Sequence, residues 1–180
     1  VAALTDTSTG QVAALTSAQA AALSSAAVSG LSTAQIARLS SAQLNALSAT
    51  QLNAMSSAQL RAIETADVAA LTTAQVVKFD TSAISELSTA QIVAMGSAQF
   101  AALTAAQLKA LSTAQLVVID TVDVAALTTA QIAALSSSAV AALTDTSTGQ
   151  VAALTSAQAA ALSSAAVSGL STAQIARLSS

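Results

Sequence analysis

The fold is decided by the stretch Leu-Thr-Thr-Ala-Gln-Ile-Ala-Ala at residues 127–134, because the chain repeats this eight-residue phrase with small variations. The octads follow one another without a break in register from Leu15 to Leu143. A short, fixed period is typical of repeat architectures, in which each unit is completed by its neighbours. The sequence therefore predicts a scaffold of many small, nearly equivalent elements.

A second, longer period is superimposed on the octads. Residues 1–41 reappear letter for letter as residues 140–180, an offset of 139 residues. This offset corresponds to sixteen octads and one eleven-residue unit, which occupies residues 4–14 and recurs at residues 143–153. We expect residues 1–180 to form a single continuous repeat array that is a window of a longer protein.

Two positions of the octad are apolar throughout, counting its leucine as position one. Position one holds Leu, Met, Ile or Phe, and position six holds an aliphatic residue or Phe, with Ala as the small exception. Apolar side chains in fixed rows indicate the core of a repeat protein. The predicted core residues are Leu31, Ile36, Leu39, Leu44, Leu71, Ile92, Leu111 and Ile132.

Position two predicts a helix start in every octad. It is restricted to Ser, Thr, Asp, Glu and Gly, all of which except Glu are favoured at helix N-caps. Position five is usually Gln, which completes a capping box, and the acidic residues that replace it suit the positive end of a helix dipole. The predicted structural caps are Ser32 with Gln35, Glu64 with Asp67, Thr72 with Gln75, and Asp120 with Asp123.

A single continuous helix does not fit the eight-residue period. Eight residues at about 100° each advance the apolar rows by about 80° beyond two turns, so no coiled-coil seam persists. A plain β-strand also fails, since positions one and six have opposite parity, although a turn within each octad keeps a β-solenoid open as the alternative. We therefore predict an all-α solenoid of very short capped helices, one per octad and two to four per superhelical turn.

Two finer features follow from the same pattern. The glutamine at position five either forms a ladder between successive turns or only caps its own helix, and the sequence leaves both open. In the eleven-residue unit, Thr5, Asp6 and Thr7 are expected to loop out before a new capping pair, Ser8 and Gln11. The same arrangement is expected where the unit recurs at residues 143–153.

The composition argues against several classes of function. The net charge is −3, and the five basic residues are scattered singly, which argues against a nucleic-acid partner. The absence of Cys, His and Tyr removes thiolate and imidazole metal ligands and most catalytic bases. We therefore expect no enzyme activity, no catalytic residue, no cofactor and no metal site. The Ser, Thr and Gln of the octads also argue against a membrane span.

The octad phrase as it stands at residues 31–39, 71–79 and 127–135 resembles a known class of repeat. It is similar to the low-complexity repeat regions of giant secreted bacterial proteins of the adhesin-like, structural surface class. The resemblance covers the whole chain. It implies secretion, an extracellular or cell-surface location, and a structural role.

The leading functional expectation is a structural repeat protein that forms an extracellular filament, fibre or sheath by self-association, because few like charges oppose contact between copies. One alternative is the rigid spacer stalk of a large surface adhesin, which would stay monomeric. Another is an ice-binding or surface-binding array of Ser and Thr hydroxyls. The expected partner is a further copy of the chain, with any attachment to a cell surface or matrix made by regions outside this window.

Overall fold

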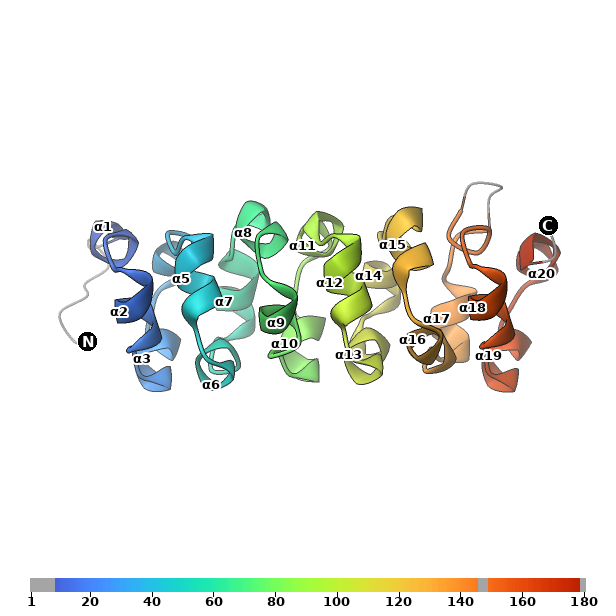
Figure 1. The fold of residues 1–180 in the computed structure, drawn as a ribbon, viewed down its shortest axis with the longest axis horizontal. Coiled ribbons are helices and arrows are strands. Elements are labelled where there is room, and N and C mark those ends of the chain that lie inside the picture. The colour runs from blue at the N-terminus through green and yellow to red at the C-terminus, as the bar shows by residue number, and fades with distance from the viewer. Residues whose placement is uncertain (1–8, 146–148, 179–180) are drawn as a thin grey trace. The chain divides into compact units, whose positions relative to one another are not determined.

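The computed structural model describes residues 9–145 and 149–178, in two compact units, Val1–Ala94 and Met95–Ser180. The described residues form α-helices of four to seven residues joined by short connections, without a β-strand, and the chain changes direction between successive helices (Figure 1). In the first unit the helices are α1 (Thr9–Ala13), α2 (Ser17–Ala21), α3 (Ser25–Ser29), α4 (Thr33–Ile36), α5 (Ser41–Ala46), α6 (Ala49–Leu52), α7 (Ser57–Ala62), α8 (Thr65–Ala69), α9 (Thr73–Val76), α10 (Thr81–Ser85) and α11 (Thr89–Ala94). In the second unit they are α12 (Ser97–Ala102), α13 (Ala105–Ala110), α14 (Thr113–Val117), α15 (Thr121–Ala126), α16 (Thr129–Ala133), α17 (Ser137–Ala141), α18 (Ser156–Ala160), α19 (Ser164–Ser168) and α20 (Thr172–Leu178).

A helix begins at position three of the octad because position two adopts the extended backbone of an N-cap. Ser32, for example, has φ −71° and ψ 160°, and its side chain accepts a hydrogen bond from the backbone N–H of Gln35. Several helices end when position one of the next octad leaves the helical region, as Leu47 does with φ −68° and ψ 143°. No described residue has a positive φ. The octad can therefore turn each corner without relying on glycine.

Helices three apart in the chain pack against each other within each unit. In the first unit α2 contacts α5, α3 contacts α6, α4 contacts α7, and α8 contacts α11. In the second unit α12 contacts α15, α13 contacts α16, and α14 contacts α17. Each turn of the solenoid thus holds three short helices. This confirms the predicted all-α solenoid and excludes the β-solenoid alternative for the described residues.

The eleven-residue unit at residues 143–153 takes the place of one helix. Beyond it the spacing of the contacts falls from three helices to two, since α16 contacts α18 and α17 contacts α19. Residues 149–153 form turns rather than a helix. The insertion is therefore absorbed at one corner, and the helices that follow stay in the same columns as those before it.

The core consists of the two apolar rows. All eight predicted core residues are buried, with exposed fractions from 0% to 6%. In octads where position five is Ala rather than Gln, that alanine is buried as well, as at Ala27, Ala83 and Ala139. Helices of this length do not stand alone in water, so the packing of one turn on the next must stabilise them.

Candidate functional site

Most helices begin with a complete capping box. At α4, the backbone N–H of Gln35 lies 3.3 Å from Ser32 Oγ, and the backbone N–H of Ser32 lies 2.8 Å from Gln35 Oε1. The other complete Ser or Thr boxes are Thr16 with Gln19, Ser40 with Gln43, Ser48 with Gln51, Ser56 with Gln59, Ser88 with Gln91, Thr104 with Gln107, Ser112 with Gln115, Thr128 with Gln131, Thr155 with Gln158 and Ser171 with Gln174. Because the box uses only the Oε1 atom of each glutamine, the Nε2 group is available for a second contact.

The Nε2 groups of the glutamines bond to the preceding turn. In the first unit, Gln43 Nε2 donates to the carbonyl oxygens of Val12 at 3.0 Å and Leu15 at 2.6 Å. In the second unit, Gln131 Nε2 donates to carbonyl oxygens at the same separations of 31 and 28 residues, both at 2.7 Å. Both glutamines are buried. The glutamine therefore does both things that the sequence left open: it caps its own helix and it forms a ladder between turns.

The ladder satisfies backbone groups that short helices leave unpaired. Every helix has N–H groups at its start and C=O groups at its end that lack partners within the helix. Gln43, in the first turn of α5, bonds the N–H of Ser40 and two carbonyl oxygens at the corner between α1 and α2. One side chain thus pairs one orphan donor and two acceptors, each of which would be costly to bury unpaired.

The acidic pairs do not form the predicted capping boxes. Glu64 occupies the N-cap of α8 but makes no side-chain cap hydrogen bond, since its side chain is longer than those that suit this position. Asp120 caps α15 through the N–H of Val122 instead. The side chains of Asp67 and Asp123 bond to the preceding turn of the solenoid. Asp67 accepts a hydrogen bond from the backbone of Ser41, and Asp123 Oδ1 accepts from Ser97 Oγ at 2.5 Å. The shorter aspartate side chain replaces the cap-and-ladder contact with a single bond to the helix three earlier in the chain, which is α5 for Asp67 and α12 for Asp123.

The predicted pair of Thr72 and Gln75 forms only half of a capping box. The hydroxyl of Thr72 accepts from the N–H of Gln75 at 3.2 Å, but the N–H of Thr72 donates to Asn45 Oδ1 at 2.9 Å. Asn45 also donates to the carbonyl oxygen of Ala70. Gln75 Oε1, buried and displaced from the cap, has no hydrogen-bond partner among the described residues. The role of asparagine at position seven was not predicted, and only its departure from the usual alanine pointed to it.

Two carboxyl groups have shifted pKa values, in opposite directions. Burial and, to a smaller extent, the negative charge of Glu64 raise the pKa of Asp67, and a hydrogen bond from the backbone of Ser41 opposes them only in part. Hydrogen bonds from the N–H of Ala83 and the hydroxyl of Ser82 lower the pKa of Asp80. Both shifts have structural causes at helix starts.

The eleven-residue unit is capped by a residue other than the predicted one. The predicted pair at the second copy is Ser147 with Gln150, and Ser147, like Thr5, Asp6, Thr7 and Ser8 of the first copy, lies outside the described residues. The N–H of Gln150 donates instead to Thr144 Oγ1 at 2.8 Å, and Gln150 Oε1 accepts from the N–H of Thr144. The capping box therefore closes across six residues, because the ordinary position-two threonine keeps its role and the insertion follows it.

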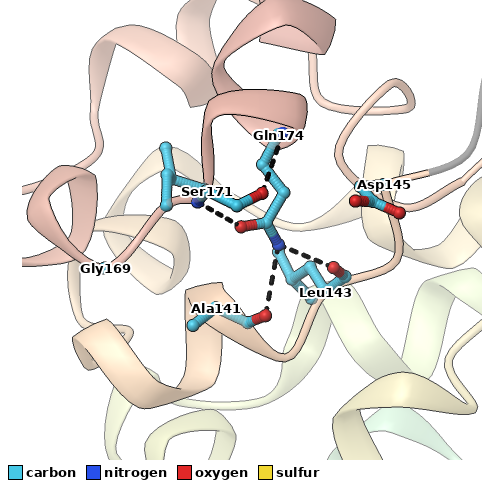
Figure 2. A pocket seen from close by; sticks show the side chains of 7 residues that line it. Ala141, Leu143, Asp145, Gly169, Ser171 and Gln174 are labelled. Atoms are coloured by element: carbon cyan, nitrogen blue, oxygen red, sulfur yellow. Dashed lines mark hydrogen bonds between the residues drawn. The ribbon is translucent and has the colours of Figure 1, made fainter.

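A cavity of about 430 Å³ lies beside this corner, and its lining includes Gln174 of the ladder and Asp145. Figure 2 shows Gln174 at its centre, where Nε2 donates to the carbonyl oxygens of Ala141 at 3.2 Å and Leu143 at 2.8 Å. The wall includes Gly169, whose missing Cβ would lie 2.6 Å from the carbonyl oxygen of Ser137. Glycine is thus required there for the close approach of α19 to α17.

Charged and metal-ligating groups are sparse on the remaining surface. Arg61 and Glu86 form an exposed ion pair at 2.7 Å. In residues 9–145 and 149–178, no three His, Cys, Asp or Glu side chains gather closely enough to hold a metal ion. Within the same ranges, no helix has both the length and the hydropathy needed to cross a membrane.

Comparison with known proteins identifies the repeat. The model of one family, the ALTTAQ repeat, matches residues 21–49, 28–62, 60–97, 92–120, 116–146 and 147–180. No curated protein and no solved structure matches the chain. The matched stretches span the octads whose Thr-Ala-Gln segments form the caps and the ladder. The chain belongs to the ALTTAQ repeat family.

Proposed function

We propose that this chain is a structural protein that self-associates into an extracellular filament, fibre or sheath. Only 7% of its residues are charged, and the net charge is −3. Repulsion between like charges is the main force that keeps soluble proteins apart, so a surface this weakly charged offers little resistance to contact between copies.

The observation that carries the proposal is a set of exposed valines on the helices or directly after them. Val77 and Val93 are exposed in the first unit, and Val117 and Val122 in the second. The exposed fraction reaches 61% at Val93 and 68% at Val122. Three of the four stand at position seven of their octads. Exposed apolar side chains on a weakly charged surface favour contact between copies.

The internal bonding supports a structural role rather than a catalytic one. The glutamines of the octads bond one turn to the one before it, as Gln59 does with the carbonyl oxygens of Val28 and Leu31. At most corners, the Ser or Thr of position two and the Gln of position five are committed to caps or to this ladder, as Ser56 and Gln59 are. Because the same bonding would also stiffen a monomeric rod, the spacer stalk of a surface adhesin is the second candidate.

Sedimentation velocity over a range of concentrations, with electron microscopy of the same samples, separates the two candidates. We expect assemblies that grow with concentration, and we expect Val77→Lys with Val93→Lys to reduce them. The matched control is Thr73→Lys with Thr89→Lys, which adds the same charge at exposed positions of the same two octads, in α9 and α11. A wild-type chain that stays monomeric throughout would contradict the filament and favour the stalk.

The extracellular location is part of the proposal and is supported by the resemblance to secreted surface repeats. Protease added to intact cells that produce the protein tests it directly. We expect the repeat region to be degraded while cytoplasmic proteins survive. Complete protection until the cells are lysed would contradict this location.

A further inference from the structure

Two turns of the solenoid have the same deficit in the glutamine ladder. In residues 39–62, position five is Gln in all three octads, and each of these glutamines donates to carbonyl oxygens of the preceding turn. In residues 63–86, and again in residues 119–142, position five reads Asp, Gln and Ala in three successive octads. We call these two stretches the first and the second sparse turn. Each keeps a single ladder glutamine, Gln75 or Gln131.

The sparse turns make fewer hydrogen bonds through position five to the turn before them. The alanine of each, Ala83 or Ala139, has no side-chain donor to offer. The aspartate of each makes one bond to the helix three earlier in the chain. At the first sparse turn, a cavity of about 230 Å³ lies between α7 and α10, with Leu60 and Ala83 in its wall. The contact of a sparse turn with its predecessor therefore has fewer buried bonds than that of residues 39–62.

The first sparse turn is also held by polar side chains at the solvent-accessible surface. Asn45, Asn53 and Arg61, at position seven of the turn before it, each donate to the backbone carbonyl oxygen 25 residues ahead, at 2.9, 3.0 and 3.0 Å. The two asparagines also accept from backbone N–H groups 27 residues ahead, and Arg61 pairs with the carboxylate of Glu86. We call Asn45, Asn53 and Arg61 the clamp.

The second sparse turn has no such clamp. Position seven of the turn before it is held by Ala101, Lys109 and Val117. Alanine and valine have no side-chain donor or acceptor, and the exposed Lys109 makes no hydrogen bond or ion pair within the part of the chain that the structure describes. The same internal deficit thus occurs once with the clamp and once without it.

We propose that the second sparse turn is a built-in opening point, where residues 119–142 separate from residues 95–118 while the fully laddered turn of residues 39–62 stays closed. The stability of a solenoid is approximately a sum over its units and the interfaces between neighbours, so the interface with the fewest bonds opens at the lowest free energy. The clamp makes the first sparse turn open less readily. Such a turn lets a rod bend or extend without unfolding its fully laddered turns. The proposal concerns a single chain and does not depend on self-association.

The clamp can be transferred to the second sparse turn and removed from the first. Lys109→Asn puts an asparagine 27 residues before Ser136, as Asn53 stands before Asp80. No glutamine competes for that N–H, since position five of the octad is alanine. The matched control is Lys109→Ala, which removes the same charge without adding a donor or an acceptor. Conversely, Asn53→Ala with Arg61→Ala removes most of the clamp.

Hydrogen exchange of the 180-residue chain, measured by mass spectrometry of its peptides, tests the proposal, with circular dichroism to verify that each variant keeps its helices. In the wild type, we expect amides of residues 119–142 to exchange about tenfold faster than those of residues 39–62, with residues 63–86 between them. Each of the two extremes is separated from the nearer end of the tested chain by 38 residues, so fraying at the ends affects both alike.

The variants separate the clamp from other causes. We expect Lys109→Asn to slow exchange in residues 119–142 by about threefold, Lys109→Ala to leave it unchanged, and the double alanine variant to bring residues 63–86 to the rate of residues 119–142. Exchange in the wild type that is as slow in residues 119–142 as in residues 39–62 would overturn the opening point. Equal slowing by asparagine and alanine at Lys109 would also overturn it, because the charge of the lysine and not the missing clamp would then control the opening.

Discussion

Asn45 shows how one residue decides whether a capping box closes in the following turn. Its Oδ1 accepts from the N–H of Thr72, which would otherwise pair with Gln75 Oε1. Asn53 makes the equivalent bond one octad later, to the N–H of Asp80, but position five of that octad is Ala83 and no glutamine is displaced. The two asparagines therefore differ in one respect. Asn45 competes with Gln75 Oε1 for the N–H of Thr72, whereas no glutamine competes with Asn53 for the N–H of Asp80.

Amide hydrogen exchange distinguishes these two situations. In Asn45→Ala, Gln75 Oε1 can take over the N–H of Thr72, so exchange at Thr72 is expected to change by less than about threefold. In Asn53→Ala, the N–H of Asp80 loses its acceptor, and its exchange is expected to accelerate by about tenfold, equivalent to about 1.4 kcal/mol. Equal acceleration at Thr72 and Asp80 would show that Gln75 does not close the box.

Asp67 occupies a position where the repeat usually has glutamine. A glutamine there would stand 31 and 28 residues after Ile36 and Leu39, the separations of the ladder bonds elsewhere. Asp67→Gln is expected to raise the free energy of unfolding by about 1 kcal/mol at pH 7, because it adds hydrogen bonds and removes a carboxylate that burial disfavours. Since the pKa of Asp67 is raised in the folded state, its carboxylate lowers the free energy of unfolding of the wild-type chain only as pH rises above 3.8. The gain should therefore shrink below that pH.

Thermal unfolding at pH 7 and at about pH 3 measures this change. Asp67→Asn is the control, because it removes the charge without restoring the reach of the glutamine side chain. We expect a smaller gain from asparagine than from glutamine at pH 7. Equal gains would show that the charge alone matters and that the ladder bond does not form at this position.

At the scale of the helix, the glutamine ladder makes the start of one helix depend on the turn before it. Gln91 illustrates this, because Oε1 accepts from the N–H of Ser88 and Nε2 donates to the carbonyl oxygens of Leu60 and Ile63, all at 2.8 Å. The residue is 1% exposed. A change of one atom, from Nε2 to a carboxylate oxygen, would therefore set a buried negative charge against two acceptors.

Gln91→Glu is expected to be more damaging than Gln91→Ala at pH 7. Alanine occupies the same octad position at Ala83 and is buried without difficulty, whereas a buried unpaired carboxylate costs about 3 kcal/mol or more. Near pH 4, a protonated glutamic acid can donate to one carbonyl oxygen, so the two variants should approach each other in stability. Thermal midpoints at both pH values test this order. Alanine being worse than glutamate at pH 7 would contradict the ladder as the dominant contact.

The sequence predicts interactions between residues that are close in the chain, and it does not predict those between residues that are far apart. The box of Ser32 and Gln35 was predictable because its members lie three residues apart. The number of helices per turn, three, was not predictable, because it depends on contacts such as those of Gln43 with Val12 and Leu15, across 31 and 28 residues. The cap by Thr144 was missed because the insertion separates it from Gln150 by six residues.

At the scale of the whole molecule, the response to pH depends on very few side chains. The chain has eight acidic and five basic residues and no His, Cys or Tyr. Unperturbed carboxyl groups titrate near pH 4 and lysine near pH 10, so no side chain with an ordinary pKa changes charge between about pH 6 and pH 9. The stability of the fold should therefore be constant across that interval.

Below this pH interval, the titrations of Asp80 and Asp67 change the free energy of unfolding in opposite directions. Hydrogen bonds lower the pKa of Asp80 in the folded state. Its stabilising contribution is therefore fully present above pH 3.8 and is lost as pH falls through the lowered pKa. The raised pKa of Asp67 acts in the opposite sense, since protonation relieves its buried charge.

We expect a thermal midpoint that is flat from about pH 6 to pH 9 and declines in acid, and we expect Asp80→Ser to reduce the decline while keeping an N-cap residue. A series of thermal midpoints at constant ionic strength measures both. A maximum inside the flat interval, or an unchanged acid decline in Asp80→Ser, would show that groups other than these carboxylates control the stability of the array.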